Sequence, residues 1–227
     1  MAAAPLDRAA FIRANLTLAP VPSIPEIRLY TAHPRSGLRR LALADAADPP
    51  APYWAYPWSG GAALARYVLD RPQTVRGRRV LDLGAGGGIV AIAAAMAGAA
   101  EVLAAEIDPN GVAALGLNAA ANGVAIAVTG ADLTAGPPPA ADLVAVGDLF
   151  YAAPLAARAT AFLDRCVAAG IEVLVGDPGR AALPRSRLRL LAEYGVPEVG
   201  ATRGAAATWA AVFAFRPEAG ATDGPRA

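Results

Sequence analysis

The sequence predicts an α/β domain built on a mostly parallel, doubly wound sheet. From residue 78 onward, short apolar runs typical of buried strands alternate with longer runs typical of helices. A glycine-rich turn joins the first of these strands to its helix, as in nucleotide-binding folds. The chain has 227 residues, of which 56% are hydrophobic and 17% charged, so it can bury one substantial core.

The first 58 residues are expected to form an extension that packs on the core domain. Residues 5–18 can form a short amphipathic helix, which prolines at positions 20, 22 and 25 would end. Residues 24–31 alternate apolar and polar side chains, a pattern typical of an extended edge segment. A linker rich in Pro, Ala and Asp at residues 45–52 then leads into an aromatic cluster.

The aromatic cluster, Pro-Tyr-Trp-Ala-Tyr-Pro-Trp-Ser-Gly-Gly at residues 52–61, directly precedes the predicted nucleotide-binding unit. Its rings either pack the extension on the core or line a ligand pocket, and both interpretations stay open for any one ring. We assign Trp58 to the pocket. Ser59 is expected to cap a helix that runs to about residue 69 and stops before Pro72.

The core domain is expected to span residues 59–216. Strands are predicted at residues 79–83, 101–106, 124–129, 142–147 and 171–176, and helices near 89–98, 110–121, 153–169 and 184–194. The segments 197–203 and 207–215 are predicted to form an antiparallel hairpin. Residues 217–227 are expected to be a frayed polar tail.

The glycine turn, Val-Leu-Asp-Leu-Gly-Ala-Gly-Gly-Gly at residues 80–88, is the centre of the predicted site. Gly84 and Gly86 allow the backbone to approach a ligand closely. Asp82 would repel a dinucleotide pyrophosphate but would attract the cationic amino-acid end of S-adenosylmethionine. The glycines alone also fit the Gly-x-Gly-x-x-Ala dinucleotide fingerprint, so NAD remains an alternative at this point.

Further acids follow the next predicted strands, at the edge of the sheet where ligands bind. Glu106 can accept hydrogen bonds from both ribose hydroxyls, a role that suits NAD as well. Asp132 is expected to meet the adenine amino group. Asp148 is expected to hold an amine acceptor, with Tyr151 as a wall of its channel. For Glu106 and Asp132 the alternative is a helix N-cap or a solvated loop acid.

Composition disfavours several other classes of protein. The net charge of +1 gives no electrostatic footprint for nucleic acid, so DNA is not an expected partner. The single cysteine, Cys166, and the single histidine, His33, leave no zinc cluster, and no metal is expected.

An uncharged run at residues 83–100 begins with closely spaced glycines and indicates a buried helix rather than a membrane span. Without a charged and apolar leader the protein is expected to be cytoplasmic.

With these residues in hand, the chain resembles the seven-β-strand (class I) methyltransferases, and more narrowly the bacterial branch of the electron-transfer-flavoprotein beta-subunit lysine methyltransferase family. The matching stretches are the aromatic cluster, the glycine turn, Glu-Ile-Asp-Pro at 106–109, Leu-Asn-Ala-Ala-Ala-Asn-Gly at 117–123, Gly-Asp-Leu-Phe-Tyr at 147–151 and Gly-Asp-Pro-Gly-Arg at 176–180. The last two stretches are specific to far fewer methyltransferases than the glycine turn is.

The resemblance implies a seven-stranded sheet and S-adenosylmethionine as cofactor. The family's Asp-x-x-Tyr motif, linked to lysine methylation, falls on Asp148 and Tyr151. Its donor-binding residues fall on Asp82, Gly84, Gly86, Glu106 and Asp132. The implied acceptors are the flavoprotein's beta subunit or a ribosomal protein. A small-molecule (nicotinamide-like) or ribosomal N-methyltransferase, or a catalytically silent donor-binding module, are the competing hypotheses.

Overall fold

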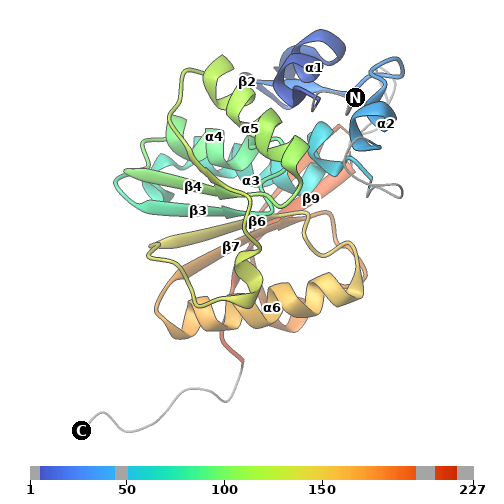
Figure 1. Ribbon diagram of the computed structural model, residues 1–227. Coiled ribbons are helices and arrows are strands. Elements are labelled where there is room, and N and C mark those ends of the chain that lie inside the picture. Colours follow the sequence, from blue (N-terminus) through green and yellow to red (C-terminus); the bar gives the residue numbers. More distant parts are fainter. Residues whose placement is uncertain (1–5, 44–50, 198–207, 219–227) are drawn as a thin grey trace, which may run out of the picture.

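A seven-stranded sheet forms the centre of the protein, in a computed structural model that describes residues 6–43, 51–197 and 208–218 (Figure 1). Its strands lie in the order β5-β4-β3-β6-β7-β9-β8. They are β3 (Arg79–Leu83), β4 (Glu101–Ala105), β5 (Ala127–Thr129), β6 (Leu143–Gly147), β7 (Glu172–Asp177), β8 (Leu188–Val196) and β9 (Thr208–Phe215). The first five are parallel, whereas β9 runs antiparallel to both β7 and β8. The predicted fold class is confirmed.

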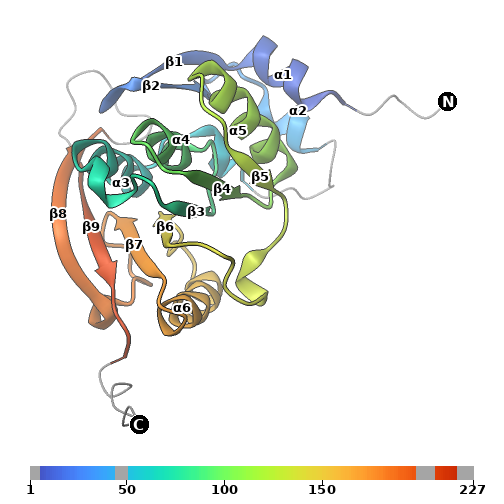
Figure 2. The same cartoon turned by 90° about the vertical axis from the view of Figure 1, so that its left-hand side faces the viewer.

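Helices cover both faces of this sheet. Three of them, α3 (Ser59–Asp70), α4 (Ile89–Met96) and α5 (Pro109–Ala121), lie on one face, and α6 (Ala153–Ala168) lies on the other (Figure 2). Because both faces are covered, the central strands are near-continuous apolar runs. Val80 and Ala145 are buried toward α3 and α4, while Val144 and Val146 are buried with Phe162 of α6.

The predicted helix at residues 184–194 is wrong. A short 3-10 helix, η4 (Arg185–Arg187), precedes strand β8, which pairs along its length with β9. Leucine, arginine and alanine favour helix locally, but pairing with β9 gives this segment its hydrogen bonds. A register shift between Leu190 and Ala192 moves the apolar pattern from one face to the other, which obscures the strand periodicity.

Three other boundaries differ from expectation. The predicted strand at 124–129 is confined to Ala127–Thr129. Residue 197 is not in a strand, and the rest of the segment predicted at 197–203 lies outside the described residues, so the first strand of the hairpin is β8. Ser59 is the first residue of α3 rather than its cap, and the N-cap position, Trp58, makes no side-chain capping bond.

The N-terminal part contains more regular structure than expected. Helix α1 (Arg8–Asn15) is followed by an antiparallel pair, β1 (Thr17–Val21) and β2 (Ile24–Thr31), then by α2 (Leu38–Ala42) and the 3-10 helix η1 (Tyr53–Ala55). Pro20 within β1 and Pro22 directly after it concealed that strand. Most of the predicted linker at 45–52 and of the tail at 217–227 lies outside the described residues. The domain boundary at residue 58 stays a prediction.

Two asparagines, Asn118 of α5 and Asn122 at the C-cap of that helix, fasten β2 to the core. Asn122 accepts a hydrogen bond from the Arg28 amide and donates one to the Arg28 carbonyl, at 2.9 and 2.7 Å. Asn118 accepts from the Tyr30 amide at 2.8 Å and donates to the carbonyl of Gly87 in the glycine turn at 2.8 Å. The N-terminal strand pair and the glycine turn are therefore held by one fully buried side chain.

Helix α3 approaches the sheet backbone to backbone, because four glycines meet at this contact. A Cβ added at Gly176 would lie 2.2 Å from the Gly60 carbonyl oxygen, and one at Gly60 would lie 2.4 Å from the Gly176 oxygen. A Cβ at Gly147 would lie 2.8 Å from the Gly61 Cα. Any side chain here must push α3 away, so the glycines fix the helix N-terminus over the ends of β6 and β7.

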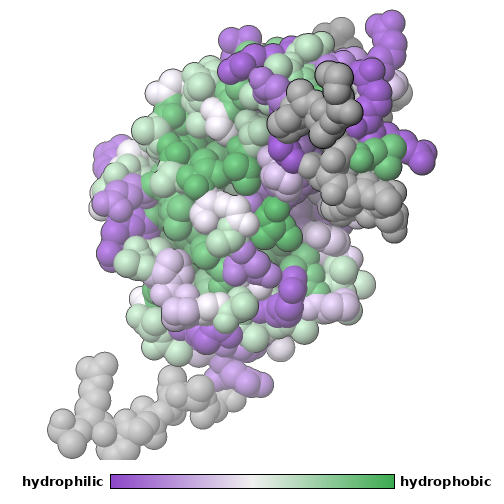
Figure 3. Space-filling model, viewed as in Figure 1, coloured by the Kyte–Doolittle hydropathy of each residue, from purple (hydrophilic) through white to green (hydrophobic). Residues whose placement is uncertain are grey.

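Some apolar side chains remain exposed at the surface. Hydrophobic residues gather on the middle of the face that Figure 3 shows, with hydrophilic ones toward its outline. Large exposed apolar side chains include Ile107, Tyr151 and Trp209. Among the described residues, no helix is both long and apolar enough to cross a membrane.

Candidate active site

A cavity of about 490 Å³ lies at the carboxyl ends of β3, β4 and β6. The chain leaves β3 in one direction across the sheet to β4 and returns on its other side at β6, so the cavity occupies the switch point where open α/β sheets bind ligands. Its lining includes seven of the eight residues predicted from the sequence, namely Trp58, Gly84, Gly86, Glu106, Asp132, Asp148 and Tyr151.

The glycine turn needs its glycines for both conformation and space. Gly84, Gly86 and Gly88 have φ values of 71°, 54° and 86°, a region that other residues rarely adopt. A Cβ at Gly84 would lie 2.8 Å from the Leu149 side chain. The turn therefore presents bare backbone to the cavity.

Glu106 joins the glycine turn to the loop after β4. Its two carboxylate oxygens accept hydrogen bonds from the amides of Gly86 and Asp108, each at 2.8 Å. Burial raises the pKa of Glu106, and these two amides oppose that effect. Each oxygen has a second lone-pair site, so the carboxylate can still accept bonds from a diol in the cavity. Glu106 lines the cavity, and its contact with the ribose of the donor stays a prediction.

We expect Glu106→Ala to weaken S-adenosylmethionine binding by about 10- to 100-fold, because hydrogen bonds to a charged group contribute about 1.5–3 kcal/mol. Isothermal titration calorimetry with the purified chain measures this change. Glu101→Ala is the matched control, because Glu101 is exposed at the other end of β4. Equal affinities of Glu106→Ala and the unmodified chain would contradict the assignment.

Asp82 does not line the large cavity. It is 1% exposed, and its Oδ2 accepts a hydrogen bond from the Ala91 amide of α4 at 2.9 Å. It lies instead on a smaller adjoining cavity of about 50 Å³ that Gly61, Trp58 and Asp148 also line. Burial raises the pKa of Asp82 to about 7. Its contact with the cationic end of the donor stays a prediction.

Asp132 has the N-cap role that the sequence left open, whereas its contact with the adenine amino group stays a prediction. It lines the cavity and is also the N-cap of the 3-10 helix η3 (Leu133–Ala135), accepting from the Thr134 amide at 2.9 Å. The Thr134 hydroxyl donates to the same oxygen at 2.6 Å, and these two bonds are the main reason that the pKa of Asp132 is lowered. The other oxygen lies 3.6 Å from Arg158 across the cavity wall.

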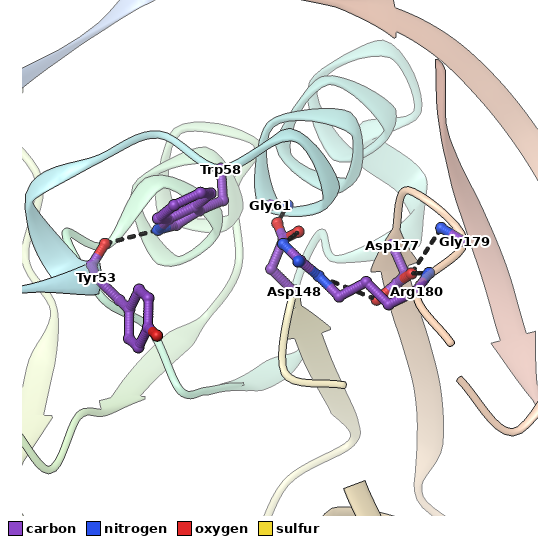
Figure 4. A network of polar contacts seen from close by, with 7 residues as sticks. All are labelled: Tyr53, Trp58, Gly61, Asp148, Asp177, Gly179 and Arg180. Atoms are coloured by element: carbon purple, nitrogen blue, oxygen red, sulfur yellow. Dashed lines mark hydrogen bonds and ion pairs between the residues drawn. The ribbon is translucent and has the colours of Figure 1, made fainter. Parts of the chain in front are cut away.

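Asp148 is the most constrained acid of the site. It is 8% exposed and, among the described residues, is the non-glycine residue with positive φ, at 56°. Its Oδ2 accepts from the Gly61 amide at 2.7 Å and its Oδ1 from the Arg180 guanidinium at 2.9 Å (Figure 4). Burial raises its pKa, against the lowering effects of Gly61 and Arg180. Two donors thus hold a buried carboxylate in the wall of the cavity.

Sequence reasoning assigned no role to Asp177 and Arg180. Both belong to the Gly-Asp-Pro-Gly-Arg segment, and Arg180 lines the cavity. Asp177 is fully buried and accepts from the amides of Gly179 and Arg180, each at 2.7 Å. The available signal was an acid, a proline, a glycine and a cation placed directly after a buried strand. Only the fold shows that the cation turns back to Asp148.

The aromatic cluster forms one wall of the cavity. The Trp58 indole N–H donates to the Tyr53 carbonyl at 2.7 Å, and Tyr53 contacts both the Trp58 ring (centroids 5.9 Å apart) and the Tyr151 ring (5.1 Å). Trp54 is buried and packs its backbone on the glycine turn, since a Cβ at Gly87 would lie 3.0 Å from its carbonyl oxygen. The cluster therefore packs on the core through Trp54 and lines the cavity through Tyr53, Trp54 and Trp58.

The sheet order, the glycine turn and the carboxylate after β4 define a class I methyltransferase that depends on S-adenosylmethionine. The residues present fit that molecule, because a cradle of bare backbone that a Cβ would fill lies beside Glu106 in a cavity of suitable size. A structure described as a putative RNA methyltransferase from Pyrococcus horikoshii shares this fold. It has a TM-score of 0.54 and 18% identity over 75% of this chain and 90% of that one.

Comparison of sequences identifies the family. The model of the family described as ribosomal protein L11 methyltransferase (PrmA) matches residues 63–146. The electron transfer flavoprotein beta subunit lysine methyltransferase of Rattus norvegicus is 40% identical over 201 residues, covering 85% of this chain and 78% of that one. The Homo sapiens protein of the same name is 36% identical over 217 residues, covering 92% and 82%. The chain belongs to the electron transfer flavoprotein beta subunit lysine methyltransferase family.

Proposed function

We propose that the chain transfers a methyl group from S-adenosylmethionine to lysine side chains of a protein, with the electron transfer flavoprotein beta subunit as its acceptor. The observation that carries the proposal is the buried Asp148 carboxylate, held by Gly61 and Arg180 on the wall of the cavity beside Tyr151. The names of the rat and human relatives support the choice of acceptor.

The charge of the cavity suits two cationic ligands. Among the described residues, four carboxylates and two guanidinium groups line it, namely Glu106, Asp108, Asp132, Asp148, Arg158 and Arg180. The resulting excess of negative charge favours a sulfonium and an ammonium group in the same space. In this proposal Asp148 holds the acceptor nitrogen, and Tyr53, Trp58 and Tyr151 form the adjoining aromatic wall of the cavity.

When bound, S-adenosylmethionine supplies the methyl group: the lone pair of the acceptor nitrogen forms the N–C bond as the C–S bond breaks, and its electron pair stays on sulfur. A free lysine has a pKa of about 10.4, so the acceptor must lose a proton to solvent before it attacks. The chain contributes alignment of the two reactants and a site where the neutral amine can exist.

Transfer of labelled methyl to purified acceptors tests the proposal. The purified chain is incubated with labelled donor and, separately, the flavoprotein beta subunit, ribosomal protein L11 and nicotinamide. We expect label in the beta subunit, recovered as methyl-lysine after hydrolysis. Label in L11 alone would favour the ribosomal acceptor, which the match of the L11 methyltransferase family to residues 63–146 also supports. Label in nicotinamide alone, or donor binding without any transfer, would overturn the proposal in favour of a small-molecule enzyme or a silent module.

Four further expectations from the sequence stay predictions. They are the cytoplasmic location and the absence of metal, of DNA and of a membrane among the partners.

A further inference from the structure

Arg180 lies between two buried acids at the end of the cavity. Its Nη2 donates to Asp148 Oδ1 at 2.9 Å, and its Nε lies 3.9 Å from Asp177 Oδ2. Its side chain is 29% exposed, against 8% for Asp148 and none for Asp177. Figure 4 shows its side chain extending from the turn after β7 toward Asp148. The guanidinium is thus the cation in direct contact with the acid assigned to the acceptor nitrogen.

The turn that carries Arg180 is built to hold it in this position. Asp177 Oδ1 accepts from two successive amides of the turn, those of Gly179 and Arg180. Gly179 has φ of 95°, which favours glycine, and its carbonyl accepts from Arg185 at 2.8 Å. The backbone is therefore fixed on both sides of the residue, and the side chain is directed back over β7 toward the end of β6.

The ion pair between Arg180 and Asp177 contains no hydrogen bond. Within the described part of the chain, neither Asp177 Oδ2 nor Arg180 Nε has a hydrogen-bond partner, although both atoms are buried. The guanidinium is therefore hydrogen-bonded to Asp148 at 2.9 Å, whereas its 3.9 Å approach to Asp177 is an ion pair without a hydrogen bond. This arrangement places its charge beside the oxygen of Asp148 and next to the acceptor's position.

The other charged groups around the cavity do not replace Arg180. Arg158 is paired with Asp132 at 3.6 Å. The remaining ionisable groups on the two cavities are acids or phenols: Asp82, Glu106, Asp108, Tyr53, Tyr56 and Tyr151. Without Arg180, an ammonium ion beside Asp148 would be surrounded by negative and aromatic groups, which favour its charged form.

We propose that Arg180 is a positioning residue for methyl transfer: it aims Asp148 at the acceptor nitrogen and lowers the pH at which that nitrogen loses its proton. The inference rests on the proposed lysine acceptor. A nearby cation disfavours protonation of an amine, and arginine itself keeps its charge throughout the accessible pH range. The amine proton leaves to solvent, after which the neutral nitrogen remains hydrogen-bonded to Asp148.

The test is the pH dependence of kcat on the flavoprotein beta subunit, between about pH 6 and 10, at saturating S-adenosylmethionine. In Arg180→Gln we expect the acid limb of the profile to move upward by about one pH unit, and kcat at pH 7 to fall at least tenfold. Arg180→Lys keeps the positive charge, so we expect the acid limb of its kcat profile to lie at the same pH as in the unmodified chain. Arg189→Gln is the matched control, since it removes an arginine charge at an exposed position of β8 that lines neither cavity and does not hold the turn of Arg180.

A uniform loss of kcat at every pH in Arg180→Gln, with the limb unmoved, would overturn the proposal in favour of a purely structural role. A second measurement separates this failure from that of the proposed function. Carbon-13 NMR of the aspartate carboxyls follows the titration of Asp148 without any acceptor, its signal being assigned by its loss in Asp148→Asn. We expect the pKa of Asp148 to rise in Arg180→Gln and not in Arg189→Gln, whether or not the beta subunit is methylated. An unchanged Asp148 titration would also overturn the inference.

Discussion

Asp148→Asn is expected to lower methyl transfer by about 10³-fold while S-adenosylmethionine affinity stays within about threefold. Asparagine tolerates the positive φ of this position and can still accept from the Gly61 amide, so the fold of the turn survives. The amide carries no charge, and its NH₂ group cannot accept from Arg180. The variant loses both the alignment of the acceptor nitrogen and the negative charge beside it, and a misplacement of about 1 Å alone can cost about 10²-fold.

The measurement is single-turnover transfer to the flavoprotein beta subunit, with calorimetric titration of the donor alongside. Asp142→Asn is the matched control, because Asp142 lies at the opposite end of β6 and pairs with Arg79. That variant should transfer methyl groups at the unmodified rate. Asp148→Asn with full activity would remove the acid from the mechanism.

Gly176→Ala is expected to lower the free energy of unfolding by about 3 kcal/mol and to abolish most of the transfer activity. The added Cβ would lie 2.2 Å from the Gly60 carbonyl and 2.8 Å from the Leu64 Cβ, and neither the backbone nor that carbon can move without moving α3. Overpacking of this kind costs about 1–3 kcal/mol, sometimes more. Displacing α3 also withdraws the Gly61 amide from Asp148.

Thermal unfolding and transfer assays check this pair of effects, and we expect the melting temperature to fall by about 10 °C. Gly116→Ala is the control, since Gly116 is exposed in α5 and an added Cβ would meet nothing within 4 Å. Alanine there should leave stability unchanged or improve it, because it is the better helix former. A Gly176→Ala protein as stable as the unmodified chain would show that α3 does not depend on the close contact.

The parallel strands could be predicted because strands that are buried on both faces appear in the sequence as short runs of apolar residues. Val80, Leu81 and Leu83 of β3 show this, and the glycine turn after them fixed the position of the site. Strand β8 could not be predicted, because it is an edge strand whose residues favour helix and whose partner lies beyond residue 207. Its conformation depends on pairing with a distant segment.

The acids of the site could be predicted because each follows a parallel strand, and those ends share one edge of the sheet. Glu106 and Asp148 reach the large cavity as expected, whereas Asp82 turns inward to the Ala91 amide. Which way a side chain points at a strand end depends on the pleat and on the neighbouring helix. The return of Arg180 to Asp148, and the glycine contact under α3, join segments far apart in sequence that show no pattern by themselves.

The wall of the cavity and the amide that holds Asp148 belong to one short segment, residues 53–61. Tyr53 and Trp58 face the ligand space, and three residues after Trp58 the Gly61 amide bonds the acid. Because both contacts belong to this segment, we expect a ligand that orders one of them to order the other, so that binding of the two reactants is energetically coupled. Such coupling is reciprocal: the factor by which bound donor improves acceptor affinity equals the factor by which bound acceptor improves donor affinity. We therefore expect calorimetric titration of the donor to give a higher affinity in the presence of the acceptor than in its absence.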